Sequence, residues 1–160
     1  MEDFRKVSNL LRASRVEQGP FKIKASNASA KRGLQYEQRV FTALKAFVSE
    51  DKFFKIEHNP WFSFTDANGH NYCAPDILLH YKHSTVVIVE VKLTWVKEAE
   101  PKLEQLYCPV ISLALNRLVA PLVICRNLTP EAPRPSFTFS EALDNPHRLL
   151  HWPATGTILW

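Results

Sequence analysis

Glycine and cysteine are both scarce in this sequence, which has four glycines and three cysteines among 160 residues. So few glycines leave no phosphate-cradling Gly-rich loop, and the G-x-x-x-x-G-K-[ST] pattern is absent, which argues against nucleotide hydrolysis that drives motion. The cysteines, Cys73, Cys108 and Cys125, are odd in number and lack the paired C-x-x-C spacing of a zinc site. We expect reduced thiols in apolar surroundings.

Long hydrophobic runs are missing as well. No apolar run is long enough to span a bilayer, and residues 1–10 are polar and charged, unlike a signal peptide. We therefore expect a cytoplasmic protein without a membrane partner. The composition, 46% apolar and 22% charged, is that of an ordinary globular domain with one core.

Positive charge is concentrated in an amino-terminal arm, residues 1–32. This arm holds eight basic and three acidic side chains, a net charge of +5, whereas the remaining 128 residues carry a net charge of −1. A basic arm on a near-neutral body suits a polyanionic partner, because Lys and Arg near phosphates release condensed counterions. A solvated flexible leader has the same composition, so charge alone leaves both interpretations open. The candidate nucleic-acid-binding residues of the arm are Lys22, Lys24, Lys31 and Arg32.

Hydrophobic patterning predicts an α/β core over residues 33–126. Three-and-four spacing of apolar residues predicts a helix over 33–50, and an aromatic run containing Pro60 predicts an edge or bulged strand over 53–64, followed by a turn at 65–71. Two β-branched runs, 76–81 and 85–93, predict a hairpin whose strands are covered on both faces. A helix kinked or divided by Pro109 is predicted over 98–118, and a short buried strand over 121–125. The order helix, three strands, helix, strand predicts a mixed central sheet flanked by helices.

The last segment, residues 127–160, contains five prolines, too many for long regular elements. No internal repeat or second domain is evident. We expect this Pro-rich extension to pack back onto the core through its apolar side chains, Phe137, Phe139, Trp152, Ile158 and Trp160.

The predicted hairpin brings two carboxylates and an ammonium group together. If its turn centres on His83, residues whose numbers sum to 166 lie opposite each other, so Asp76 faces Glu90 with Cβ atoms about 5 Å apart. Lys92 follows Glu90 by two positions and lies on the same face. An ion pair between Glu90 and Lys92 at an exposed strand end is the alternative, but the flanking residues are too apolar for that.

Two carboxylates on buried strands need a compensating cation, and Mg²⁺ prefers oxygen ligands of this kind together with water and phosphate oxygens. The backbone carbonyl of Val91 offers a further oxygen. Glu37 occupies a core position in the apolar stripe of the first helix, where a carboxylate needs a partner. That partner is either the metal site or a basic side chain, Arg39, Lys45 or one from the arm.

In chain order, Glu37, Pro75-Asp76 and Glu90-Val91-Lys92 resemble the motif of the PD-(D/E)XK nuclease superfamily, and the resemblance covers about residues 33–126. It implies a restriction-endonuclease-like αβββαβ core and a Mg²⁺-dependent deoxyribonuclease in which Mn²⁺ substitutes. By resemblance, Asp76 and Glu90 bind the metal, Lys92 orients or activates the attacking water, and Glu37 is an accessory ligand.

Some members with exonuclease activity add a Gln and a Tyr on the following helix. Here Gln105 is a minor candidate, and Tyr107, at a different spacing, is expected to be a packing residue. His58 and His70 lack any metal-binding spacing. DNA is the expected partner, RNA stays an alternative, and a homodimer is expected by analogy with small domains that cut duplexes. The rival hypothesis is an inactive nucleic-acid-binding or assembly protein on the same fold, against which the intact motif argues.

Overall fold

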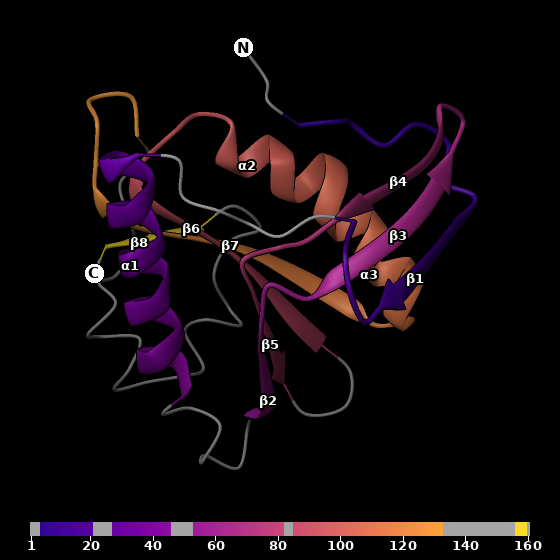
Figure 1. Cartoon of the computed structure of the whole chain (residues 1–160), viewed down its shortest axis with the longest axis horizontal. Helices are drawn as coiled ribbons and strands as arrows, with labels where there is room; N and C mark the ends of the chain where they lie inside the picture. The colour runs from indigo at the N-terminus through magenta and orange to yellow at the C-terminus, as the bar shows by residue number, and fades with distance from the viewer. Residues whose placement is uncertain (1–3, 21–26, 46–52, 82–84, 133–155, 160) are drawn as a thin grey trace.

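The computed structural model describes residues 4–20, 27–45, 53–81, 85–132 and 156–159. In this part of the chain, a five-stranded and a three-stranded sheet are combined with helices (Figure 1). In chain order the elements are β1 (Arg12–Val16), α1 (Ala28–Leu44), β2 (Phe53–His58), β3 (Trp61–Asp66), β4 (Gly69–Cys73), β5 (Ile77–Tyr81), β6 (Thr85–Thr94), α2 (Ala99–Lys102), a π-helical turn (Leu103–Tyr107), α3 (Cys108–Leu115), β7 (Leu118–Asn127) and β8 (Gly156–Leu159).

The larger sheet has the strand order β2-β5-β6-β7-β8, antiparallel from β2 to β6 and parallel from β6 to β8. The predicted mixed α/β architecture is therefore confirmed. The hairpin register is confirmed too, because Ile77 pairs with Val89 and Leu79 with Val87, and both pairs sum to 166. This register brings Asp76, which precedes β5, to the level of Glu90 in β6.

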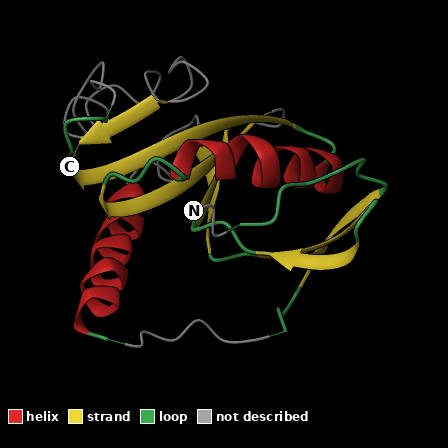
Figure 2. Cartoon of the chain, turned by 90° about the horizontal axis from the view of Figure 1, so that it is seen from above, coloured by secondary structure: helices red, strands yellow, loops and turns green. Residues whose placement is uncertain are grey.

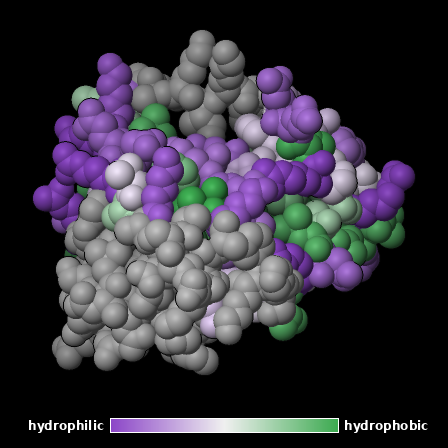
Figure 3. All heavy atoms as spheres, turned by 90° about the horizontal axis from the view of Figure 1, so that it is seen from below, coloured by the Kyte–Doolittle hydropathy of each residue, from purple (hydrophilic) through white to green (hydrophobic). Residues whose placement is uncertain are grey.

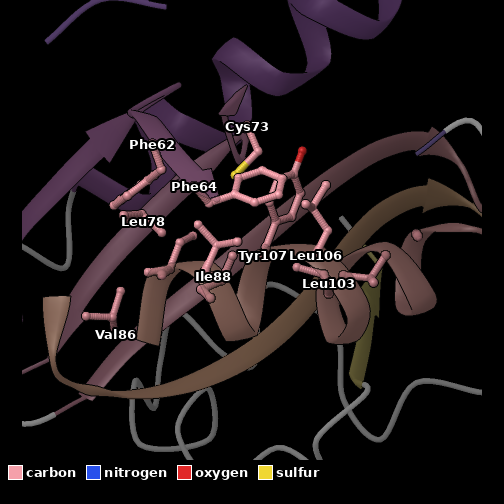
Figure 4. Packing of buried hydrophobic residues seen from close by; sticks show 13 residues of the cluster. Phe62, Phe64, Cys73, Leu78, Val86, Ile88, Leu103, Leu106 and Tyr107 are labelled. Atoms are coloured by element: carbon pink, nitrogen blue, oxygen red, sulfur yellow. The ribbon is translucent and has the colours of Figure 1, made fainter. Parts of the chain in front are cut away.

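Both faces of the larger sheet are covered, as the continuous apolar run of β6 predicts. One cluster joins Tyr36, Val40 and Leu44 of α1 to the odd-numbered residues of β6. The other joins the even-numbered residues of β6 to the π-helical turn, α3 and β3. Figure 2, from above, shows the helix of residues 99–115 and α1 as separate elements beside the long strands. Figure 4 shows the second cluster, in which Phe62 and Phe64 of β3 meet Ile88 and Tyr107.

The predicted strand over 53–64 is two strands in two different sheets, which corrects that interpretation. Asn59 has a left-handed backbone with φ of 50°, and Pro60 follows it, so the chain turns out of the larger sheet there. β3 then pairs with β4, so most of the predicted turn at 65–71 is strand, and only the tip, with Gly69 at φ of 108°, is a tight turn.

The described parts of the basic arm, residues 4–20 and 27–32, are built into the fold, contrary to the leader interpretation. β1 pairs antiparallel with β3, and upstream of it Ser8 donates its backbone N–H to Asp66, which also forms an ion pair with Arg5. α1 begins at Ala28, five residues earlier than predicted. Asn27 caps it by accepting a hydrogen bond from the backbone N–H of Ala30 at 2.8 Å.

The helix predicted over 98–118 runs from Ala99 to Leu115 as α2, the π-helical turn and α3 in succession. Pro109 lies in the first turn of α3 and does not divide this helix. The π-helical turn ends at Tyr107, two residues before this proline. Pro109 has no N–H to offer the carbonyl of Gln105, which accepts the backbone N–H of Val7 at 3.0 Å instead. The helix ends at Leu115, and its C-cap Asn116 has a left-handed backbone with φ of 51°. The predicted end at residue 118 is therefore too late, because Leu118 already belongs to β7.

β7 spans ten residues, twice the length predicted. From the Pro-rich extension, β8 adds to it as a parallel edge strand. Ile158 pairs with Ile124 there, whereas Phe137, Phe139, Trp152 and Trp160 lie outside the described residues. None of the helices in the described ranges is long and apolar enough to cross a membrane.

Candidate active site

A hollow of about 290 Å³ opens where β5 begins and β6 continues past it. α1 packs on one face of the sheet and α2 leads into the helix on the other, so both helices reach this point. All four predicted catalytic residues and Val91 line the hollow. Its described lining is Ala30, Gly33, Leu34, Glu37, Asp76, Glu90, Val91, Lys92, Leu93 and Lys102.

Glu90 lies at the centre of the site and is 1% exposed. Its Oε1 accepts hydrogen bonds or ion pairs from two ammonium groups, Lys92 Nζ at 3.2 Å and Lys102 Nζ at 3.3 Å. Its other oxygen, Oε2, is buried without a hydrogen-bond partner among the described residues. A buried, unpaired carboxylate oxygen is costly unless something binds it.

Asp76 faces the same hollow and is held by the backbone of β6. The N–H of Val91 donates to its Oδ2 at 2.7 Å. Burial raises the pKa of Asp76 well above its usual range, and the negative charges of Glu90 and Glu37 raise it further, outweighing the Val91 hydrogen bond and Lys92. The hollow thus brings three carboxyl groups, those of Asp76, Glu90 and Glu37, together with two ammonium groups, those of Lys92 and Lys102.

Lys92 is the cation of the predicted motif. Burial lowers its pKa, but the carboxylates of Glu90 and Asp76 outweigh burial, so the pKa of Lys92 is raised and the amine stays protonated. Its ammonium therefore serves the site as a fixed positive charge and a hydrogen-bond donor.

Glu37 lines the hollow as predicted, but its partner is His58, which the sequence analysis passed over. His58 Nε2 lies 2.8 Å from Glu37 Oε1, and the imidazole stacks on Phe41 with ring centroids 4.7 Å apart. In the part of the chain that the structure describes, no ion pair joins Glu37 to Arg39, Lys45 or a basic residue of the arm. The signal for His58 is its register, because it pairs with Ile77, next to Asp76.

The helix brings Lys102 and Tyr107 close to Asp76 and Glu90, and it does not bring Gln105 into the described lining. Gln105 is absent from the described lining of the hollow, whereas Lys102 reaches Glu90. The Tyr107 hydroxyl donates to the carbonyl of Ala74 at 3.1 Å, two residues before Asp76. In Figure 4 the phenolic oxygen of Tyr107 points out of the apolar cluster. Burial, followed by the charges of Glu90 and Asp76, raises the pKa of Tyr107 well above its ordinary value.

The residues present fit a divalent cation. In the described ranges, no three His, Cys, Asp or Glu side chains form a group that holds a metal ion by themselves. Mg²⁺, however, is commonly held by one or two carboxylates while water and substrate phosphate oxygens complete its shell. A cation at this point would bind the unpartnered Oε2 of Glu90 and would favour the ionised form of Asp76, whose pKa is raised.

Two of the four predicted nucleic-acid-binding residues can be located. Lys31 and Arg32 are exposed in the first turns of α1, next to Ala30 and Gly33 of the hollow. Lys22 and Lys24 lie outside the described residues.

A second buried charge cluster lies away from the hollow. Glu57 Oε2 accepts a hydrogen bond from His80 Nε2 at 2.7 Å and pairs through Oε1 with Arg15. Arg117 donates to His80 Nδ1 at 2.9 Å, which fixes the neutral tautomer. Burial opposes ionisation of Glu57, but the hydrogen bonds from His80 and Arg15 prevail and lower its pKa to about 2. This cluster connects β1 with β2 and β5 and has a structural role.

A larger hollow, of about 530 Å³, lies between β1, β3 and α3. Its described lining includes His70 and the exposed apolar residues Leu11 and Leu113 but has no carboxylate. Figure 3, seen from below, shows apolar and hydrophilic residues side by side on the half of the molecule that carries the three-stranded sheet and α3. This second hollow therefore lacks the groups for metal-assisted hydrolysis.

Comparisons with known proteins identify a fold neighbour but no family. No family model matches the chain, and no curated protein matches it. The chain is similar to a solved structure, protein VC1899 from Vibrio cholerae, with a TM-score of 0.51 and 13% sequence identity. The match covers 83% of this chain and 32% of that one, so the chain spans about a third of its neighbour's length. At this identity the likeness shows the fold alone.

Proposed function

We propose that the protein is a metal-dependent nuclease that hydrolyses phosphodiester bonds in DNA at the hollow formed by Asp76, Glu90 and Lys92. One observation carries this proposal. Glu90 presents a buried, unpartnered oxygen beside a second carboxylate of raised pKa and a fixed ammonium group. Two carboxylates and a lysine that converge on one small hollow are suited to phosphodiester hydrolysis.

The fold supports the proposal through its chain order. α1, β2, β5, β6, a helix and β7 follow one another in the order of an αβββαβ core, with β6 and β7 parallel and the earlier strands antiparallel. The β3–β4 hairpin and β1 are additions to this core. The resemblance to the PD-(D/E)XK superfamily implies the same order, which supports the proposal.

Each side chain has a distinct task in this proposal. Asp76 and Glu90 would hold a divalent cation, which supplies a Lewis acid for the scissile phosphate and lowers the pKa of water. Lys92 orients the attacking water and stabilises negative charge on the phosphate oxygens. Glu37, held by His58, adds an acceptor at the rim of the hollow. Val91 fixes the orientation of Asp76 through its N–H.

DNA is the proposed substrate, and the exposed Lys31 and Arg32 beside the hollow support binding of a phosphate backbone. Such contacts do not depend on sequence and weaken as salt concentration rises. RNA has the same phosphodiester linkage, so the assay compares the two polymers. A homodimer would bring two such sites to one duplex.

The proposal is tested by cleavage of end-labelled single-stranded, duplex and branched DNA, and of RNA, with Mg²⁺, Mn²⁺ or EDTA. We expect metal-dependent cutting by the wild type and a loss of at least about 100-fold in Lys92→Ala, since an oriented water and a stabilising charge are both removed. Lys97→Ala, an exposed lysine outside the described lining of the hollow, is the matched control. DNA binding without cutting under any metal would refute the nuclease and leave a binding or assembly protein.

A further inference from the structure

Two ammonium groups share one oxygen of Glu90, and the proposed chemistry uses only one of them. Lys92 belongs to the same strand as Glu90, whereas Lys102 approaches from α2, twelve residues away in the sequence. Both side chains are about one-third exposed, 34% for Lys92 and 28% for Lys102. Lys102 therefore needs a separate explanation.

The π-helical turn places Lys102. In a π-helix, residues five positions apart lie on the same side, and Lys102 is five positions before Tyr107. The Lys102 ammonium lies 5.2 Å from the centroid of the Tyr107 ring, within the range of a cation–π contact. Tyr107 is itself buried and fixed by its hydrogen bond to Ala74. Lys102 thus has a rigid aromatic surface along which its flexible side chain can rest.

Charge balance at Glu90 changes when a divalent cation arrives. In the metal-free site, Lys102 and Lys92 together neutralise a carboxylate that is almost fully buried. A dication bound to the same carboxylate repels both ammonium groups over a short distance. Lys92 is attached at strand β6 and faces Asp76 and Glu37 as well, whereas Lys102 has Glu90 as its one ion-pair partner among the described residues.

We propose that Lys102 and the divalent cation compete for Glu90, and that metal binding frees the Lys102 ammonium to bind a phosphate of the nucleic acid strand. This inference rests on the proposed function for its second half, the phosphate contact. Lys102 closes the site while metal is absent and becomes part of the substrate-binding surface once metal is present. Metal and nucleic acid then bind with positive cooperativity, because each favours the displaced position of Lys102.

The competition is tested without any cleavage, by calorimetric titration of the full chain with Mn²⁺ alone. Lys102→Gln removes the competing charge, so we expect Mn²⁺ to bind about tenfold more tightly than to the wild type. Lys102→Arg keeps the charge and should stay within about twofold of the wild type. Lys97→Gln removes an exposed charge five residues earlier and is the control for the general loss of positive charge. Equal or weaker Mn²⁺ binding by Lys102→Gln, with an unchanged unfolding temperature, would overturn the competition.

The phosphate contact is tested with a labelled, nuclease-resistant oligonucleotide at several salt concentrations, with and without Mn²⁺. With Mn²⁺, Lys102→Gln should lower the slope of log affinity against log salt by about one, and without Mn²⁺ the slopes should agree. Identical slopes with Mn²⁺ would overturn this half of the inference.

The two proposals fail in different ways. If the wild type cuts DNA and Lys102→Gln matches it in both titrations, the inference about Lys102 is wrong and the nuclease stands. If the wild type binds Mn²⁺ more weakly than Lys102→Gln but cuts nothing, the competition stands and the nuclease is wrong. If the wild type binds no Mn²⁺ at all, both are wrong.

Discussion

Replacing Asp76 with Asn should stabilise the metal-free protein while it removes metal binding. Burial and the neighbouring charges of Glu90 and Glu37 raise the pKa of Asp76, so the folded protein binds this proton more tightly than the unfolded chain does. The stability of the wild type therefore declines as pH rises above the usual range of an aspartate. Asn does not titrate, so the stability that Asp76→Asn gains over the wild type is smallest in acid and grows towards pH 8.

The size of the gain follows from the geometry of the strand pair. Carboxylates on facing residues, with Cβ atoms about 5 Å apart, repel by about 3 kcal/mol at an effective dielectric constant of about 20. Lys92 offsets part of that repulsion, and the Val91 N–H loses about 1 kcal/mol when its acceptor becomes neutral. A net gain of about 1–2 kcal/mol remains at pH 8, which raises the unfolding temperature by about 3–6 °C in a domain of this size.

The assay is thermal unfolding of the wild type and Asp76→Asn between pH 5 and pH 8, with EDTA and with excess Mn²⁺. Mn²⁺ should stabilise the wild type and leave Asp76→Asn unchanged, because a ligand stabilises only the state that binds it. Asp66→Asn is the matched control: the Ser8 N–H and Arg5 lower the pKa of Asp66, so this change should destabilise the protein. A lower unfolding temperature for Asp76→Asn in EDTA at pH 8 would refute the reasoning.

Three further changes probe groups around the site and the second charge cluster. His58→Ala leaves Glu37 without its hydrogen-bond donor, so we expect its unfolding temperature to fall by about 3–6 °C, and His58→Gln should restore most of this loss. Equal unfolding temperatures for the two variants would contradict this. Tyr107→Phe removes the donor to Ala74 and should lower kcat about tenfold with KM unchanged in a cleavage assay; an unaltered kcat would count against it. Glu57→Gln should lower the free energy of unfolding at pH 7, measured by urea unfolding, by about 1–2 kcal/mol, allowing for solvent screening. Because the pKa of Glu57 is lowered to about 2 in the folded state, this cost should vanish as pH falls from about 4.5 towards 2. A cost that stays undiminished at pH 2 would show that the ion pair is not its cause.

The predicted core of the site followed from local patterning. Only three residues separate the two β-branched runs, and this short spacing predicts one register, so the facing of Asp76 and Glu90 could be predicted by arithmetic alone. Glu37 was found because a carboxylate in an apolar stripe needs a partner. The partner of Glu37 is His58 in β2. This pairing follows from the register of β2 on β5, which the sequence alone does not determine.

The features that escaped prediction depend on long-range contacts. Residues 12–16 form a strand only because β3 offers an edge 49 residues away, as the contact of Ser14 with Ser63 illustrates. The break at Asn59 moves β3 into another sheet, which a run of alternating aromatics does not reveal. The π-helical turn places Lys102 and Tyr107 on one side of the helix, whereas the resemblance to the nuclease superfamily suggests Gln105. Each case involves a partner remote in sequence or an irregular backbone.

A metal-dependent nuclease at this hollow is tested most sharply by measuring Mn²⁺ binding and cutting of labelled duplex DNA on the same samples of wild type and Asp76→Asn. We expect the wild type to bind Mn²⁺ and cut, and EDTA to abolish the cutting. Asp76→Asn should do neither although it is more stable, so that unfolding does not explain its inactivity. Equal cutting by the two proteins, or cutting by the wild type in EDTA, would contradict a metal-dependent nuclease at this site.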